Sequence, residues 1–321
     1  MPGKLVIRPI NGLCNRLGVV SSFAVLARRS GRQLTVCWTT SRGWSDEKLE
    51  DLFENGFVYA SEGEFAFSNA VGVRLHEQLG VRGVGGVDEV WSASAGEAFA
   101  AVFDAAAHPV IAYHGYRRCQ DLIPPESRRR LLPRFERDYA AELRRWRPID
   151  PIQTQVDELA SKFDDHTVGV HIRRGDAATH PRTVNQYGRS SDAAFMAAMD
   201  RIRKRRPETS FFLATDCPET EQRFLERYGE AILSNPAKRF VPSIYGAPKE
   251  NQYDAVVDLF TLARSQRLLG SYYSTFSTTA ATLGGIRLQV VVEDSRLARL
   301  RRAARLGRHE AARRARALKR W

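Results

Sequence analysis

The chain has 321 residues and a formal net charge of +12 at pH 7, with 43% hydrophobic and 10% aromatic residues. This composition is typical of a soluble globular protein, and the length favours two domains. No apolar run is long enough to cross a bilayer, and the residues after Met1 contain no signal-peptide core. The four cysteines are widely spaced, which argues against a zinc site or a disulfide framework and favours a cytoplasmic location.

The positive charge is concentrated at the carboxyl end. Residues 296–321 contain eleven Lys and Arg against a single acidic residue, Glu310, and so carry +10 of the formal +12. Such a basic tail is expected either to lie on an anionic membrane surface as a peripheral contact or to remain solvated. Nucleic-acid binding is disfavoured, because Trp321 is the only aromatic residue of the tail.

The first half begins with a strand–helix–strand pattern, in which apolar residues recur at helical spacing between two aliphatic runs. Gly31 is suited to end the helix. A long basic helix further on either contains Pro133 or breaks there. Residues 60–108 show no clear pattern, and Pro148 and Pro151 mark the expected domain boundary. The predicted elements are strand 4–10, helix 16–30, strand 33–38, strand 109–113 and helix 124–146.

The second half alternates helices and strands at a regular spacing, which is typical of a parallel sheet with right-handed crossovers. It lacks the glycine patterns of dinucleotide-binding and P-loop proteins. The predicted elements are helix 152–163, strand 167–173, helix 192–205, strand 209–215, helix 218–228, strand 231–233, helix 252–265, strand 267–270, helix 276–284 and strand 287–292. We therefore predict an α/β protein with an N-terminal domain over 1–150, a nucleotide-binding domain over 151–295 and the tail over 296–321.

The first candidate site lies at the end of the predicted strand 167–173. This apolar run ends in His171, Arg173 and Arg174, and Asp176 follows. In open α/β sheets, ligands bind beyond the carboxyl ends of the strands. The guanidinium fork of Arg suits phosphate, because it makes bidentate, charge-assisted hydrogen bonds. The stretch predicts a site for a phosphorylated ligand, with pairing between Arg and Asp side chains as the alternative.

Two further strand ends carry polar side chains. Asp216 comes just before Pro218, so it either caps the next helix or faces a ligand. Ser274, Thr275 and Ser277 belong to a hydroxyl-rich stretch at the start of the last helix. A helix N-terminus attracts anions through its free N–H groups and its dipole, and the hydroxyls add donors. N-capping alone is the alternative.

These motifs resemble those of the fucosyltransferases of the α1,6 and protein-O-fucosyl type, which include the bacterial nodulation fucosyltransferases. Gly12–Arg16 is similar to their N-terminal G-x-x-N-R/Q pattern, and His171–Asp176 to the H-x-R-R-x-D stretch of the α1,6 group. Phe212–Asp216 looks like an F-L-A-T-D strand end. Asp258 followed by Ser274–Ser277 looks like an aspartate helix and an S-x-F-S turn.

The resemblance implies a GT-B architecture, in which two Rossmann-like domains with parallel sheets face a cleft. It also implies an inverting, metal-independent transfer of fucose from the donor GDP-fucose to a glycan or glycolipid-type acceptor, with no cofactor. Arg173 would contact the β-phosphate and stabilise the leaving GDP. This role suits a guanidinium, because its positive charge can stabilise the negative charge that develops on the departing diphosphate. The other implied donor contacts are His171 and Asp258 at the guanine, Ser274 and Ser277 at the pyrophosphate, and Asn15 and Arg16 near the sugar and phosphates.

The sequence departs from the family at the general base. The α1,6 enzymes carry a glutamate ten positions after the motif histidine, where this chain has Pro181. Asp176 and His180 are the candidates for the base, and a dissociative route without an enzymic base is the alternative. This divergence leaves a different acceptor or a different nucleotide sugar open within the same class of enzyme.

Overall fold

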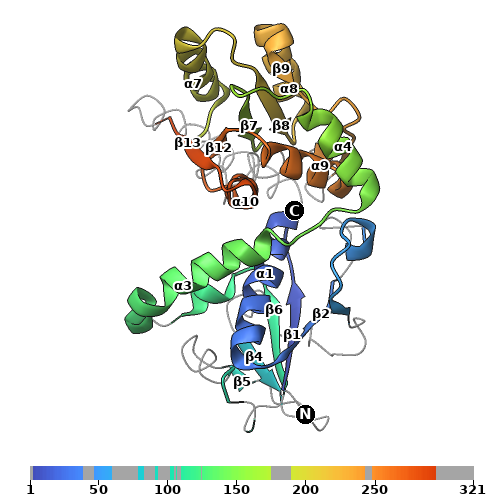
Figure 1. Ribbon diagram of the computed structural model, residues 1–321, viewed down its shortest axis with the longest axis vertical. Helices are drawn as coiled ribbons and strands as arrows, with labels where there is room; N and C mark the ends of the chain where they lie inside the picture. Colours follow the sequence, from blue (N-terminus) through green and yellow to red (C-terminus); the bar gives the residue numbers. More distant parts are fainter. Residues whose placement is uncertain are drawn as a thin grey trace, which may run out of the picture. The chain divides into compact units, whose positions relative to one another are not determined.

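The computed structural model describes residues 3–38, 47–59, 79–82, 91–92, 102–104, 106, 110–123, 125–174, 189–242 and 248–293. The chain divides into two compact units, Met1–Ile149 and Asp150–Trp321 (Figure 1). Within these described ranges, no helix combines the length and the apolar character that a membrane span requires.

The described strands of the first unit form a six-stranded sheet with the order β3–β2–β1–β6–β4–β5. The first four strands of this order pair in parallel, whereas β4 runs antiparallel to β6 and β5 antiparallel to β4. Because β1 has β2 on one side and β6 on the other, the strand order reverses at β1. The strands are β1 (Lys4–Pro9), β2 (Gln33–Val36), β3 (Val58–Tyr59), β4 (Leu79–Arg82), β5 (Trp91–Ser92) and β6 (Val110–Gly115).

Helix α1 (Leu13–Ser30) connects β1 to β2 and packs against α3 (Pro125–Leu143). It begins three residues earlier than the sequence predicts, because the carbonyl of Gly12 accepts hydrogen bonds from the backbone N–H groups of Asn15 and Arg16. Gly31 ends it with a φ of 66°, as expected for a left-handed C-cap. Helix α3 continues through Pro133 without a break. Short 3₁₀ turns, Leu49–Asp51 and Cys119–Leu122, complete the described elements of this unit.

The second unit contains a five-stranded, fully parallel sheet with the order β13–β12–β7–β8–β9. Numbered within the unit, this is the doubly wound order of nucleotide-binding domains, with its reversal between β7 and β12. The strands are β7 (Val168–Ile172), β8 (Phe211–Thr215), β9 (Ile232–Leu233), β12 (Arg267–Ser271) and β13 (Arg287–Val291).

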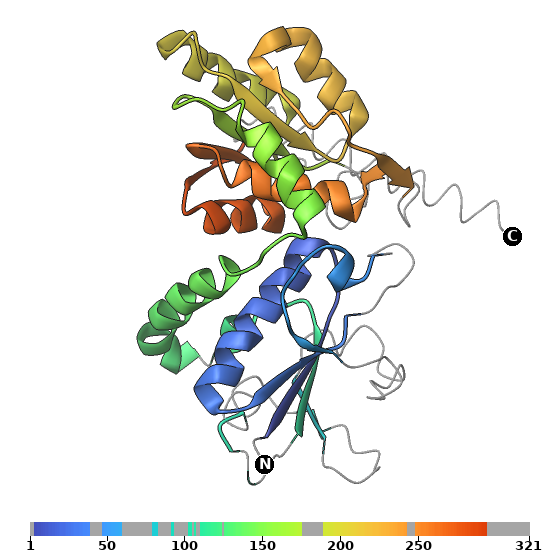
Figure 2. The same ribbon diagram turned by 45° about the vertical axis from the view of Figure 1, so that its right-hand side comes forward.

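Helices cover both faces of this sheet, as Figure 2 shows. Apolar side chains of α7 and α8 form one core cluster with β7, β8 and β12, whereas α9 and α10 contact β7, β8 and β12 on the other face, and α4 packs on α9. The helices are α4 (Asp150–Ala160), α7 (Asp192–Arg205), α8 (Pro218–Tyr228), α9 (Gln252–Leu262) and α10 (Thr275–Gly284), with a 3₁₀ turn at Gly229–Ala231.

One element of this unit is not predicted by the sequence. An antiparallel hairpin of β10 (Phe240–Pro242) and β11 (Pro248–Glu250) lies between β9 and α9. Strands of three residues are too short to show an alternation of apolar and polar side chains, so the pattern carries no signal for them.

Candidate active site

The site of the second unit lies where β7 and β12 run side by side. These strands pair in parallel up to Gly270 and His171, with β8 on the far side of β7 and β13 on the far side of β12. In doubly wound sheets, ligands bind at the carboxyl ends of the two strands where the order reverses. The sheet thereby brings together the three strand ends that the sequence predicts, which are those of β7, β8 and β12.

His171 joins β7 to the start of α10. Its Nδ1 atom lies 2.8 Å from Ser277 Oγ, and its ring stacks on Phe276 with centroids 4.5 Å apart. Burial, aided by the positive charges of Arg173, Lys238 and Arg174, lowers the pKa of His171 to about 3. The imidazole is therefore neutral at physiological pH and can accept or donate a hydrogen bond without carrying charge.

Arg173 is held by groups from both neighbouring strands. Its guanidinium donates to Asp216 Oδ2, and its backbone N–H donates to Ser271 Oγ at 2.9 Å. The other carboxylate oxygen of Asp216 accepts the backbone N–H of Arg174 at 2.6 Å. The Arg173 side chain stays 28% exposed, whereas that of Asp216 is 8% exposed. Asp216 thus orients the guanidinium of Arg173, and part of the Arg173 side chain still faces solvent.

The structure corrects the capping alternative for Asp216. The N-cap residue of α8 is Cys217, and it makes no side-chain cap hydrogen bond. Asp216 instead binds Arg173 and the backbone of Arg174. The sequence misses this role because the partners lie more than forty residues away along the chain.

Arg174 points to a different partner from Arg173. Its guanidinium donates to Asp192 Oδ1 from Nε at 3.1 Å and from Nη2 at 2.6 Å, at the first residue of α7. Arg223 binds the other oxygen of the same carboxylate. Arg174 thus links β7 to α7 and α8, and a contact with a nucleotide remains a prediction. Asp176, His180 and Pro181 lie outside the described residues.

The start of α10 provides the hydroxyl groups that the sequence predicts. Ser274 is the N-cap, and its Oγ accepts the backbone N–H of Ser277 at 3.4 Å. Ser277 is fully buried and engaged with His171, whereas Thr275, the first helical residue, is exposed. The first turn contains no acidic residue. Its backbone dipoles therefore meet no protein carboxylate from their own helix, as suits an anion site.

Asp258 lies on α9 in a buried ion pair that the sequence does not predict. Lys238 Nζ lies 2.6 Å from Asp258 Oδ2, and the two side chains are 2% and 0% exposed. Lys238 also donates to the backbone carbonyl of Thr215 at the end of β8. In this structure Lys238 therefore engages the carboxylate that the resemblance assigns to guanine, and that assignment remains a prediction. Lys238 falls in the segment before the unpredicted hairpin, where no motif marks it.

Asn15 and Arg16 lie in the first unit, in the first turns of α1 after β1. Arg16 is 1% exposed, and its guanidinium carbon lies 3.6 Å from the ring centroid of Trp38. Burial lowers the pKa of Arg16 to about 9. Asn11, just before the helix, adopts a φ of 72°. This turn sits at the reversal of strand order in the first unit, which is the position of a ligand site in such sheets.

In the part of the chain that the structure describes, no group of three or more His, Cys, Asp or Glu side chains is placed to hold a metal ion.

Comparison with known proteins gives a structural match only. No family model matches the sequence, and no curated protein sequence matches it either. A mutant of Arabidopsis thaliana FUT1 in complex with GDP matches with a TM-score of 0.57 and 14% identity, over 92% of this chain and 71% of that chain. The fucosyltransferase NodZ from Bradyrhizobium matches with a TM-score of 0.53 and 16% identity, over 87% and 93% of the two chains.

A third match is POFUT1 in complex with GDP-fucose, with a TM-score of 0.52 and 14% identity, over 90% of this chain and 98% of that chain. At sequence identities of 14% to 16%, the structural similarity to these proteins establishes the fold of the chain. The chain has the GT-B fold of these fucosyltransferases, with two Rossmann-like domains, and the expected α/β fold class is confirmed.

Proposed function

We propose that the protein is a glycosyltransferase that transfers fucose from GDP-fucose to a glycan or glycolipid-type acceptor. The observation that carries this proposal is Arg173, which Asp216 and Ser271 hold at the reversal of strand order, next to the start of α10. Solved proteins of the same fold bind GDP and GDP-fucose. A positioned guanidinium beside a helix N-terminus is suited to a diphosphate.

The proposed reaction inverts the configuration at the anomeric carbon of fucose. The acceptor hydroxyl attacks this carbon from the face opposite to GDP. The bond from the carbon to the β-phosphate oxygen breaks, and its electron pair stays with GDP. The acceptor proton passes to a base, for which Asp176 is the sequence's first candidate. Arg173 stabilises the negative charge that develops on the β-phosphate in the transition state.

The same groups support a reaction that needs no metal and no cofactor. In other enzymes a bound cation neutralises a departing diphosphate. Here the Arg173 guanidinium and the N–H groups at the start of α10 supply that electrostatic stabilisation. His171, which is neutral at physiological pH, adds a hydrogen-bonding group beside Arg173 without adding charge.

The test is release of GDP from GDP-fucose in the presence of candidate glycan acceptors, with and without excess EDTA. We expect acceptor-dependent release that EDTA leaves nearly unchanged. A loss of activity that Mn²⁺ restores would contradict the metal-independent mechanism. Faster turnover of a different nucleotide sugar would place the protein in the same class with a different donor.

We propose that the enzyme is located in the cytoplasm and contacts the membrane surface through residues 296–321. The support is the net +10 of this segment against a nearly neutral remainder. Clusters of Lys and Arg bind anionic lipid surfaces. Such contact would bring the enzyme to lipid-linked acceptors. Nucleic-acid binding by the same arginines is the competing function, and RNA binding that depends on these residues would favour it.

A further inference from the structure

The second unit has a second hollow, at the end of its sheet opposite to the proposed donor site. It has a volume of about 610 Å³ and lies at the amino ends of β7 and β12, beside the carboxyl end of α7. Arg201, Arg205, Arg206 and Arg267 line it, together with the neutral hydrogen-bonding groups of Thr209 and Gln289. Its size is in the range of small-molecule sites.

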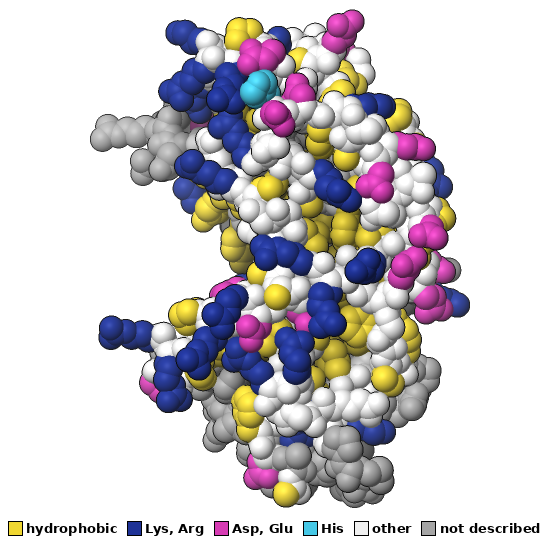
Figure 3. Space-filling view, viewed as in Figure 1, with side chains coloured by type: hydrophobic (Ala, Val, Ile, Leu, Met, Phe, Trp, Pro, Cys, Tyr) yellow, Lys and Arg dark blue, Asp and Glu magenta, His cyan; other side chains and the backbone are white. Residues whose placement is uncertain are grey.

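The charge of this hollow is strongly positive. Asp165 is the one acidic residue of its lining, and the four arginines form no ion pair with a carboxylate anywhere in the described ranges of the chain. Arg206 contacts the ring of His166, with Nη1 3.3 Å from Nδ1. In Figure 3, Lys and Arg side chains gather over α7, and Asp and Glu side chains lie beside them.

The helix dipole explains only part of this arrangement. Basic residues in the last turn of α7 are stabilised by the partial negative charge at a helix C-terminus. Arg267, however, starts β12, and its register partner Arg287 starts the neighbouring strand β13. Like charges side by side on adjacent strands are unfavourable. The fold therefore places Arg267 of the hollow between the arginines at the end of α7 and Arg287, which lies outside the lining, and a bound anion would relieve the repulsion among them.

The pKa of Arg267 responds to the same repulsion. Burial lowers its pKa, and the charges of Arg206, Arg287 and Arg205 lower it further. A dianion in the hollow would reverse this effect, since an opposite charge favours the protonated guanidinium.

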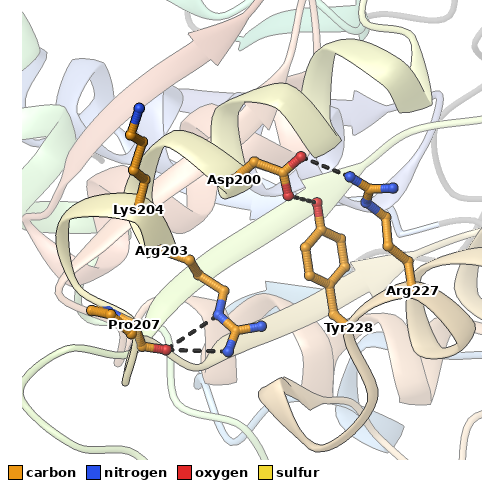
Figure 4. Close-up of a pocket in the computed structure, with 6 residues that line it drawn as sticks. All are labelled: Asp200, Arg203, Lys204, Pro207, Arg227 and Tyr228. Carbon is orange, nitrogen blue, oxygen red and sulfur yellow. Dashed lines mark hydrogen bonds and ion pairs between the residues drawn. The ribbon is translucent and has the colours of Figure 1, made fainter.

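A neighbouring hollow of about 450 Å³ provides a contrast (Figure 4). There Asp200 accepts hydrogen bonds from Arg227 and from Tyr228, both at 2.8 Å. Arg203 donates two hydrogen bonds to the backbone carbonyl of Pro207. Arg203 and Arg227 thus each have an acceptor within the protein. The four arginines of the larger hollow, in contrast, pair with no carboxylate in the described part of the chain.

We propose that the larger hollow binds a phosphate group, carried either by a soluble phosphorylated molecule or by the headgroup of an anionic lipid. Several guanidiniums can donate hydrogen bonds to the oxygens of one phosphate group. The hydroxyl of Thr209 and the amide of Gln289 add further donors. The site is separate from the proposed donor site, and this inference does not depend on the proposed function.

The test compares the whole wild-type chain with the double variant Arg206→Gln and Arg267→Gln. Inorganic phosphate or pyrophosphate is titrated against chloride at constant ionic strength, and the melting temperature is measured. At 100 times the dissociation constant, we expect the wild type to gain about 5 °C more than the double variant. In chloride alone, the double variant should melt at or above the wild-type temperature, because the repulsion is relieved.

The matched control is Arg203→Gln with Arg227→Gln in the smaller hollow, which should keep the full gain in phosphate. Any phosphate bound near Arg173 is common to all three proteins and cancels in the comparison. An equal gain in the wild type and in the Arg206 and Arg267 double variant would overturn the proposal.

Vesicle sedimentation distinguishes the two sources of phosphate. The wild type and the double variant, which share the same basic tail, are mixed with phosphatidylcholine vesicles with and without phosphatidic acid. Weaker binding of the double variant to the acidic vesicles would identify a lipid headgroup as the ligand. Equal vesicle binding, together with a phosphate gain confined to the wild type, would identify a soluble phosphorylated molecule.

Discussion

At the scale of single residues, the orientation of Arg173 carries the proposed chemistry. Asp216 binds its guanidinium, and Ser271 accepts its backbone N–H. A guanidinium that is already bound by a carboxylate, on a backbone that is itself hydrogen-bonded, loses little conformational entropy when it binds a phosphate, which favours catalysis by preorganised charge. Asp216 is thus a residue that positions Arg173, and it is not itself a catalytic residue.

Arg173→Ala should lower the rate of GDP release from GDP-fucose by about 100- to 1000-fold, the loss typical of removing one preorganised donor. Arg173→Lys should recover little of it, because Lys supplies the charge without the planar fork. Arg223→Gln, which removes an exposed guanidinium from Asp192, is the control and should keep near-normal turnover. Near-normal rates for either Arg173 variant would exclude the leaving-group role.

His171 should make the protein labile to acid. Its pKa is about 3 in the folded protein, below the ordinary value of 6.5 for histidine, so between these values the unfolded chain binds more protons. Stability conferred by the neutral ring is complete above pH 6.5 and is lost as the pH falls toward 3. Between pH 6.5 and 5, the loss should be roughly 1.5 kcal/mol.

Urea unfolding at several pH values checks this prediction. His171→Gln, which cannot titrate, should be less stable than wild type at pH 7 and should show a flatter dependence on pH between 6.5 and 5. Identical slopes for the two proteins would mean that another group causes the acid lability.

At the scale of elements, the packing of α10 on β12 shapes the site. A Cβ atom added to Gly270 would lie 2.6 Å from Ser277 Cβ and 2.7 Å from Leu288 Cδ1. The glycine thus lets the helix approach the strand closely enough for Ser277 to reach His171. Tyr273, in the turn between them, adopts a φ of 60°, which is rare for an aromatic residue.

Gly270→Ala should therefore push the start of α10 off the sheet. We expect a loss of about 2 kcal/mol of stability from overpacking, and a weaker stabilisation by GDP because the anion site moves. Urea unfolding with and without GDP measures both effects. Gly56→Ala is the control, since nothing lies within 4 Å of a Cβ at that position. Unchanged stabilisation by GDP in the Gly270 variant would show that α10 takes no part in binding.

The elements of the second unit could be predicted because their signals are local. The predicted bounds of α7 and α8 agree with the structure, since both helices have strong caps or a proline at the first position. The ion pairs could not be predicted. Asp192 with Arg174 and Lys238 with Asp258 join residues of different elements that no local sequence pattern connects, so their pairing depends on how these elements pack together. Residues 60–108, whose pattern is poor, include β4 and β5.

At the scale of the whole molecule, charge divides the chain into two parts with different expected roles. Removing residues 296–321 leaves a formal net charge of +2. The truncated chain should bind phosphatidylglycerol vesicles about 100-fold or more weakly than the full chain, because each Lys or Arg near the surface contributes about 1 kcal/mol. Its stabilisation by GDP should be unchanged.

Vesicle sedimentation and RNA binding, both measured against salt, check this division of roles. Loss of RNA binding without loss of vesicle binding on truncation would instead favour the nucleic-acid function. A loss of GDP binding on truncation would show that the tail belongs to the donor site.

The carboxyl ends of β7 and β12 are proposed to bind GDP-fucose, and titration calorimetry on the full chain measures this binding without the need for an acceptor. GDP and GDP-fucose should bind in the presence of EDTA, UDP and NAD should not bind, and Arg173→Ala should strongly weaken the binding of GDP. Preferential binding of UDP or NAD, or GDP binding that Arg173→Ala leaves intact, would contradict the proposal.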